Sequence, residues 1–220
     1  METYVLRVWL PDRPGALGAV ASRIGAVKGD VTGIEILETG AGQAVDELVV
    51  RLPDATLVDL LVSEVRQVDG VQVEEVRAVG PAGHDPRSAT LETAAQLVGA
   101  TSRAELLEVA RDVAPVSLQA SWVAVVDLET SDVLAAGERS PTASWIGAFV
   151  HGARSAEQLG SPEVRPDSAG SDVIWAKLPE VDLAVVAGRE RIAWREREKR
   201  ELDALAHIVA IRWSELPSDA

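Results

Sequence analysis

The stretch from residue 80 to residue 86 constrains the fold of this chain most. Two prolines and two glycines fall within seven residues there. Such a stretch continues neither a helix nor a central strand, because proline lacks an N–H donor and glycine adds backbone freedom. A chain of 220 residues is long enough for two small domains that each bury a core. We therefore predict one domain over residues 1–80, a linker over 81–87 and a second domain over 88–220.

The charge and the cysteine content exclude several classes of protein. The formal net charge is −14, and acidic residues outnumber basic ones on both sides of the break. The negative charge of such a chain repels the phosphates of nucleic acid and of anionic membranes. With no cysteine, disulfides, zinc ribbons, iron–sulfur clusters and thiolate nucleophiles are excluded. The N-terminal apolar run is too short for a signal peptide, and no stretch reaches the roughly 18 apolar residues of a membrane span. We therefore expect a cytoplasmic protein.

Apolar patterning in the first domain predicts the order strand, helix, strand, strand, helix, strand. Leu17, Val20, Ile24 and Val27 recur at helical spacing after a β-branched run. The expected strands cover residues 4–10, 31–39, 44–52 and 71–79, and the expected helices follow Pro14 and Pro53. That order in about 80 residues is typical of a ferredoxin-like βαββαβ fold of the α+β class.

Two loops of this domain resemble those of the ACT family. They are Leu10-Pro11-Asp12-Arg13-Pro14-Gly15-Ala16-Leu17 and Gly29-Asp30-Val31-Thr32-Gly33-Ile34. The resemblance covers residues 3–79 and implies a regulatory module that binds amino acids or similar effectors, usually between paired ACT domains. It therefore also implies a homodimer or higher oligomer. One departure is that residues 1–80 contain no asparagine, which many ligand-binding members carry in or near this loop.

The same loop is the candidate binding site on chemical grounds. Backbone N–H groups at the start of the first helix can receive a ligand carboxylate, and a glycine allows close approach. Asp12 could meet an ammonium group, and the second strand could supply an apolar wall. The candidate ligand-binding residues are Asp12, Arg13, Pro14, Gly15, Ala16, Leu17, Ile34, Glu35 and Ile36. In the alternative interpretation the loop only shapes the strand-to-helix connection and the domain only dimerises.

The second domain is predicted to hold an antiparallel sheet with flanking helices. Ser102 and Glu105 form a capping-box pattern before an apolar run. We expect helices over 90–98, 102–113, 144–150, 155–159 and 191–213, and strands over 121–128, 133–136, 173–178 and 181–187. This order, with residues 183–189 and 201–210, resembles a GAF-like sensor domain. The resemblance implies a cup for a small molecule, and the lack of cysteine excludes covalent attachment of a tetrapyrrole.

A search for enzyme chemistry finds no supporting motif. The sequence lacks a nucleophile elbow, a zinc-protease helix and a phosphate-binding loop. His151 has no second histidine or carboxylate pair nearby to suggest a metal site. Asp46 and Glu47 are interpreted as a solvated strand face, and the charged run 189–201 as a solvated helix start. We therefore predict no catalytic residue, no metal and no cofactor.

Three functional hypotheses remain from the sequence. The first is a non-catalytic small-molecule sensor whose ACT domain binds an amino acid or similar effector at a dimer interface, with no direct partner in nucleic acid or membrane. The second is a dimerising scaffold that binds no ligand. The third is a hydrolase or transferase, which would need a polar cluster around His151.

Overall fold

A computed structural model describes residues 1–79, 86–158, 172–190 and 192–217. The chain separates into two compact units. Unit 1 comprises Met1–Asp85 together with Arg195–Arg197, and unit 2 comprises Pro86–Trp194 and Glu198–Ala220. Each unit is described by itself below.

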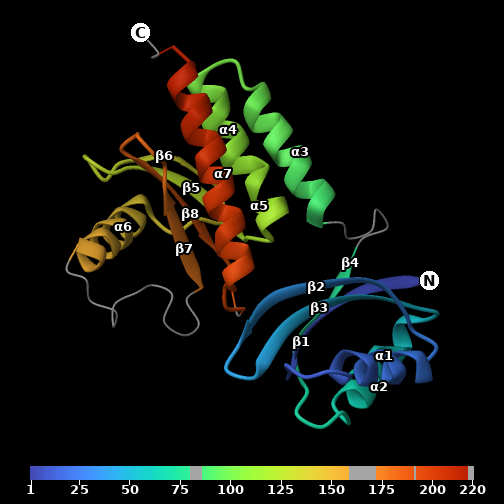
Figure 1. Ribbon diagram of the computed structural model, residues 1–220. Helices are drawn as coiled ribbons and strands as arrows, with labels where there is room; N and C mark the ends of the chain where they lie inside the picture. Colours follow the sequence, from blue (N-terminus) through green and yellow to red (C-terminus); the bar gives the residue numbers. More distant parts are fainter. Residues whose placement is uncertain (80–85, 159–171, 191, 218–220) are drawn as a thin grey trace. The chain divides into compact units, whose positions relative to one another are not determined.

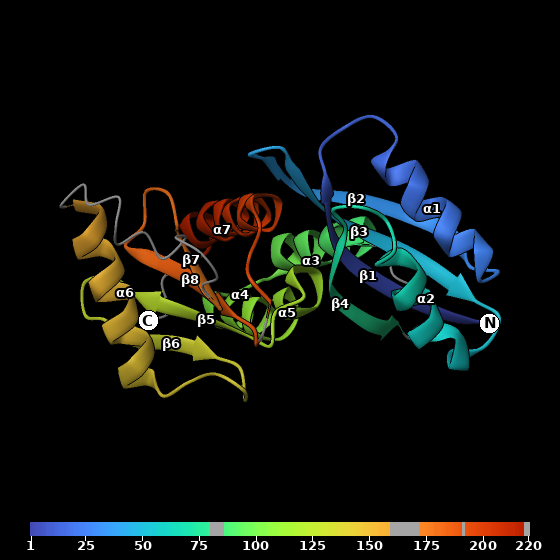
Figure 2. The same ribbon diagram turned by 90° about the horizontal axis from the view of Figure 1, so that it is seen from below.

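Unit 1 is a four-stranded antiparallel sheet with two helices on one face (Figures 1 and 2). The strands run in the order β2-β3-β1-β4, which is the ferredoxin-like arrangement predicted from the sequence. The elements are β1 (Glu2–Pro11), α1 (Ala16–Ala26), β2 (Asp30–Gly40), β3 (Gln43–Leu52), a single 3₁₀ turn η1 (Ala55–Leu57), α2 (Val58–Val65) and β4 (Gln72–Val79). Asp54 accepts a hydrogen bond from the N–H of Thr56 at 2.8 Å, so the predicted cap opens the 3₁₀ turn.

The central strands β1 and β3 pair without interruption from Glu2 opposite Leu52 to Pro11 opposite Gln43. Because side chains alternate across a strand, every second residue faces the helices. Leu6 and Leu48, which are directly paired, are both buried in the helix-facing core. The other buried residues of that core are Tyr4, Val8, Leu10, Ala16, Val20, Ile24, Val27, Ala44, Val50, Leu52, Leu61, Val65 and Val71.

The edge strand β2 pairs with β3 less regularly. Its register shifts between Val31 and Gly33 and again between Ile36 and Glu38. Each shift is a bulge or irregularity, and the four residues between the two shifts, from Gly33 to Ile36, pair continuously with β3. Ile34 and Ile36 therefore lie in a short regular segment of an edge strand.

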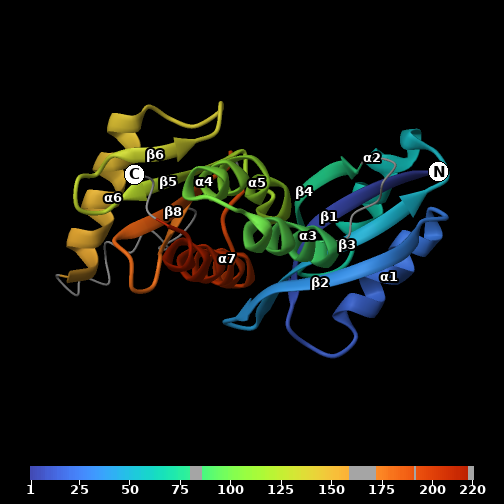
Figure 3. The same cartoon turned by 90° about the horizontal axis from the view of Figure 1, so that it is seen from above.

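Unit 2 is a second four-stranded antiparallel sheet, in the order β6-β5-β8-β7. Helix α6 lies on one face and helices α3, α4, α5 and α7 lie on the other (Figures 1 and 3). The elements are α3 (Pro86–Gly99), α4 (Arg103–Asp112), α5 (Ala114–Leu118), β5 (Trp122–Asp127), β6 (Val133–Ala136), α6 (Ala143–Gln158), β7 (Val173–Lys177), β8 (Leu183–Gly188) and α7 (Glu196–Glu215). The predicted strands are all present, and α5 is a helix that the sequence did not predict.

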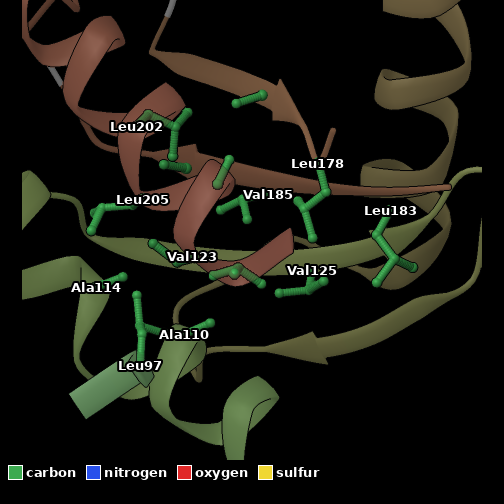
Figure 4. Close-up of a cluster of buried hydrophobic side chains, with 14 of the residues drawn as sticks. Leu97, Ala110, Ala114, Val123, Val125, Leu178, Leu183, Val185, Leu202 and Leu205 are labelled. Carbon is green, nitrogen blue, oxygen red and sulfur yellow. The ribbon is translucent and has the colours of Figure 1, made fainter. Parts of the chain in front are cut away.

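Both faces of this sheet are buried. Val123, Val125 and Val185 face the core between the sheet and the four helices. Figure 4 shows this core, to which the helices contribute Leu97, Leu202 and Leu205. The intervening residues on β5 and β8 face α6, where they pack with Ile146 and Val150. Burial on both sides explains why these strands are continuous apolar runs without alternation.

Helix α6 corrects the prediction of two short helices over 144–150 and 155–159. Residues 143–158 form one helix, and residue 159 lies outside the described residues. Ile146, Val150 and Ala153 are buried at helical spacing, so the apolar face continues past Gly152. A glycine inside a helix costs about 1 kcal/mol relative to alanine, which this packing offsets.

The start of α7 corrects the prediction of a solvated charged run. Arg189 and Glu198 are both buried, and the guanidinium donates to both carboxylate oxygens, at 2.6 and 2.8 Å. The same guanidinium donates to the carbonyls of Ile192 and Ala193 and lies 3.9 Å from the ring centroid of Trp194. One arginine thus satisfies the backbone between β8 and α7 and pairs with a carboxylate of the helix.

We expect Arg189→Met to lower the free energy of unfolding of the chain by about 3–5 kcal/mol, because it removes the buried guanidinium that donates to both carboxylate oxygens of Glu198. Urea unfolding followed by circular dichroism measures this. In the double variant Arg189→Met/Glu198→Gln the loss should be smaller, since no uncompensated charge remains. A single variant as stable as the wild type would show that the pair contributes nothing.

Candidate functional site

The predicted binding loop is anchored at the end of the central strands. The N–H of Asp12 donates to the carbonyl of Gly42 at 2.9 Å, and the N–H of Arg13 donates to the carbonyl of Pro11 at 2.8 Å. The first of these bonds joins the loop to the hairpin between β2 and β3. The loop after β1 and the end of the edge strand therefore lie at the same end of the sheet.

Helix α1 begins without a side-chain cap. Gly15 stands at the N-cap with φ +89°, a left-handed conformation that glycine adopts without strain. Glycine has no side chain that could cap the helix, and no acidic residue lies in the first turn. The N–H of Ala16 donates to the carbonyl of Arg13 at 3.3 Å. The next N–H groups, of Leu17 and Gly18, belong to the first turn and point along the helix axis toward the loop, where an anion can accept from them.

The edge strand presents two exposed isoleucines on the helix-covered face of the sheet. Ile34 pairs with Leu48 and Ile36 pairs with Asp46, so both face the helix-covered side of the sheet. Their side chains are 49% and 57% exposed, which is unusual for residues in phase with a core. Glu35 pairs with Glu47 and faces the opposite side of the sheet.

The structure brings six of the nine candidate residues together in the loop and the first turn of α1, and it places Ile34 and Ile36 farther along the sheet, level with Leu6 and Val8 of β1. Asp12, Arg13, Pro14 and Gly15 are exposed, Leu17 is half-buried, and Ala16 is buried in the core. Ile34 and Ile36 lie on the neighbouring strand. Glu35 does not join them, because strand alternation turns its side chain to the other face.

Asp46 and Glu47 correct the prediction of a solvated strand face, since both side chains are buried. Glu47 pairs with Arg7 directly across the sheet, accepting from Nε at 3.0 Å and from Nη2 at 2.8 Å. Asp46 faces the helix side and is 3% exposed. Its Oδ1 has no hydrogen-bond partner among the described residues. Burial, and then the nearby charge of Asp12, raise the pKa of the Asp46 carboxyl above its ordinary value.

Asp46 is a buried acidic residue that sequence reasoning missed, although a signal was present. In β3 the residue alternates in phase with Leu48, Val50 and Leu52, all of which are buried. A carboxylate in the apolar phase of a strand is a candidate buried charge, not a solvated one. Because the next residue, Glu47, is also acidic, the apolar phase to which Asp46 belongs is hard to recognise from the sequence.

Among the described residues we find neither a metal-binding cluster nor a membrane-spanning helix. No group of three or more His, Asp or Glu side chains among them could hold a metal ion. His151 is exposed on α6, and His84 lies outside the described residues. In the described part of the chain, no helix combines the length and the apolar character that crossing a membrane requires.

We expect Asp46→Asn to raise the stability of the chain at neutral pH. A carboxyl whose pKa is raised by folding binds protons more tightly in the folded state, so its contribution to stability falls as the pH rises above the unfolded value near 3.8. Asparagine keeps the shape and removes the charge. Thermal unfolding measured from pH 3 to pH 8 should show the melting temperature of the variant rising relative to that of the wild type as the pH increases. An equal pH dependence in both proteins would contradict this.

Comparison with known proteins adds a family match in this unit. The model of the ACT domain family matches residues 4–70. A search of the curated proteins finds no match.

Among solved structures, three similar chains illustrate the likeness. An unknown protein from Galdieria sulphuraria is 16% identical with a TM-score of 0.32, over 43% of this chain and 63% of that one. The ACT domain of a GTP pyrophosphokinase from Chlorobium tepidum is 16% identical with a TM-score of 0.29, over 36% of this chain and all of that one. The C-terminal domain of the MgtC protein from Mycobacterium tuberculosis is 17% identical with a TM-score of 0.31, over 39% and 95%. The chain thus spans slightly less than two thirds of the first of these proteins.

The loop motif, the strand order and the family match agree on the same stretch of chain. Residues 4–70 are an ACT domain, a member of a regulatory, ligand-binding domain family.

Proposed function

We propose that this protein is a non-catalytic regulatory sensor whose ACT domain binds an amino acid or a similar small effector. One observation carries the proposal: the uncapped start of α1 and the exposed Ile34 and Ile36 belong to the same, helix-covered side of the sheet. A ligand carboxylate accepts from the N–H groups of α1, where the helix dipole contributes about 0.3–1 kcal/mol. The two isoleucines receive an apolar side chain. The effector acts by binding two arrangements of the protein with different affinity.

The test is isothermal titration of the full chain with each of the twenty amino acids, on the wild type and on two Gly15 variants. Asparagine and aspartate both tolerate the left-handed conformation of Gly15, and they differ in charge. We expect Gly15→Asp to weaken binding about tenfold more than Gly15→Asn, because a fixed carboxylate repels that of the ligand. Silence of the wild type toward all twenty would reject the proposed function.

We further propose that two copies of the chain pair through the edge strand β2. An edge strand presents unpaired N–H and C=O groups, and here it also exposes Ile34 and Ile36. Pairing of β2 with the β2 of a second copy covers both isoleucines and places the effector site beside the interface.

Ile34→Asp should raise the dissociation constant of this dimer about tenfold or more, since burying one isoleucine stabilises an interface by about 1.5–3 kcal/mol. Sedimentation equilibrium over a range of concentrations measures the effect. Leu91→Asp is the matched control, because Leu91 is 71% exposed on α3 in unit 2. A monomeric wild type, or equal effects of the two substitutions, would count against pairing through β2.

The same exposed strand also favours a second function, that of a dimerising scaffold without a ligand. A dimer that forms as predicted while the titrations stay silent would support the scaffold. For unit 2 we propose a GAF-like sensor role, in which its two-faced sheet and helices bind a second small molecule or transmit the state of the ACT domain. A second, independent binding event in the titrations would support the first of these roles.

A further inference from the structure

Helix α3 of unit 2 is apolar on two opposite sides. Thr93 and Leu97 are buried on its inner side, and Figure 4 shows Leu97 in the core of the unit. Leu91 and Ala95 each stand two residues before one of these, and Val98 continues their stripe at a spacing of three residues. Two residues correspond to about 200° of rotation in an α-helix. The second stripe therefore lies on the side of α3 that faces away from the core.

The outward stripe is exposed although it is apolar. Leu91 is 71% exposed and Val98 is 58% exposed. Only two of the 14 residues of α3 are charged. A surface helix normally carries polar side chains on its outward side, and a helix that is apolar all round is normally buried. A further large apolar residue, Val116, is exposed on α5, which packs against α3. These residues therefore mark a surface for a binding partner.

Carboxylates accompany this stripe on α3 and on its neighbour α4. Glu92 is exposed on α3 itself. Glu105 and Glu108 are exposed on α4, which packs against α3. Among the described side chains of the two helices, Arg87 in the first turn of α3 is the only exposed basic one. The surface thus combines an apolar stripe with negative charge.

We propose that the outward side of α3 binds a basic amphipathic helix of a partner protein. The apolar face of that helix covers Leu91 and Val98, whose separation of seven residues is two turns of a helix. Its lysine and arginine side chains lie opposite Glu92 on α3 and opposite Glu105 and Glu108 on α4. The inference concerns unit 2 alone and does not depend on any ligand of the ACT domain.

The charge of the chain favours this occupant over the alternatives. A second copy carries the same net charge of −14 and brings carboxylates against carboxylates on this surface. The phosphates of an anionic membrane are repelled in the same way. A basic helix is attracted instead, and the apolar contacts hold it in place once it arrives. Because the carboxylates are exposed, added salt weakens the attraction.

The test uses the full chain and three fluorescent peptides of about 18 residues, long enough for five helical turns. The first has leucine on one helical face and lysine on the other. The second has the same composition in an order that forms no apolar face, and the third has glutamate in place of lysine. Fluorescence anisotropy should show that the wild type binds the first peptide at least tenfold more tightly than either of the others. Its affinity should fall as the salt concentration is raised.

Two exposed residues of the surface are each compared with a matched exposed residue on α2 of unit 1. Leu91→Asn removes an apolar contact without changing the charge and should weaken binding of the first peptide about tenfold. Leu60→Asn is its control, because Leu60 is 47% exposed on α2. Glu108→Lys should weaken binding about fivefold and reduce the salt dependence. Asp59→Lys, also exposed on α2, makes the same change of charge and should have little effect.

Several results would overturn the inference. Equal affinity for the first two peptides would show that charge alone attracts them, and binding of none would show that the surface takes no such helix. Equal effects of Leu91→Asn and Leu60→Asn would place the binding elsewhere on the chain. Sedimentation equilibrium of the chain without peptide tests the remaining occupant. Self-association that Leu91→Asn abolishes and Leu60→Asn does not would assign the surface to a second copy instead.

Discussion

The uninterrupted pairing of β1 with β3 is the constraint on which unit 1 depends. Ten consecutive residue pairs fix which side chains face the helices and which face away. A slip of one residue would exchange Leu6 and Leu48 for Arg7 and Glu47 in the core, so the register is strongly specified. The same register fixes Asp46 on the helix side and holds the loop after β1 at the end of the sheet where β2 finishes.

That register also positions the candidate loop, on a chain that is acidic on both sides of residues 80–86. The net charge of −14 makes the surroundings unfavourable for an anion, and α1 provides only the partial positive charge of its first turn. The proposed effector, a zwitterionic amino acid, brings its own positive charge, which offsets this field better than an anion could.

The sequence predicted the order of elements in both units well, because β-branched runs, turn residues and apolar spacing are local signals. Pro14, Gly15 and Asp54 act within a few residues of where they stand, and their positions were foreseen. The wrong predictions concern long-range pairing. Arg189 reaches Glu198 only after the chain turns, and Asp46 is buried on β3, which is an inner strand of its sheet. A local sequence pattern predicts that a charged residue is exposed to solvent. It cannot reveal an ion-pair partner or a covering element that lies farther along the chain.

The two irregularities of β2 also limit how this edge can grow. A regular edge strand accepts further strands without end, which is the route to ordered aggregates. Here two register shifts divide the pairing into segments of two, four and three residues, and such irregularities bend and twist a strand away from a flat ladder. In the proposed dimer one partner strand adds beside Ile34 and Ile36, while the irregular edge offers no flat template for a continuing stack of strands.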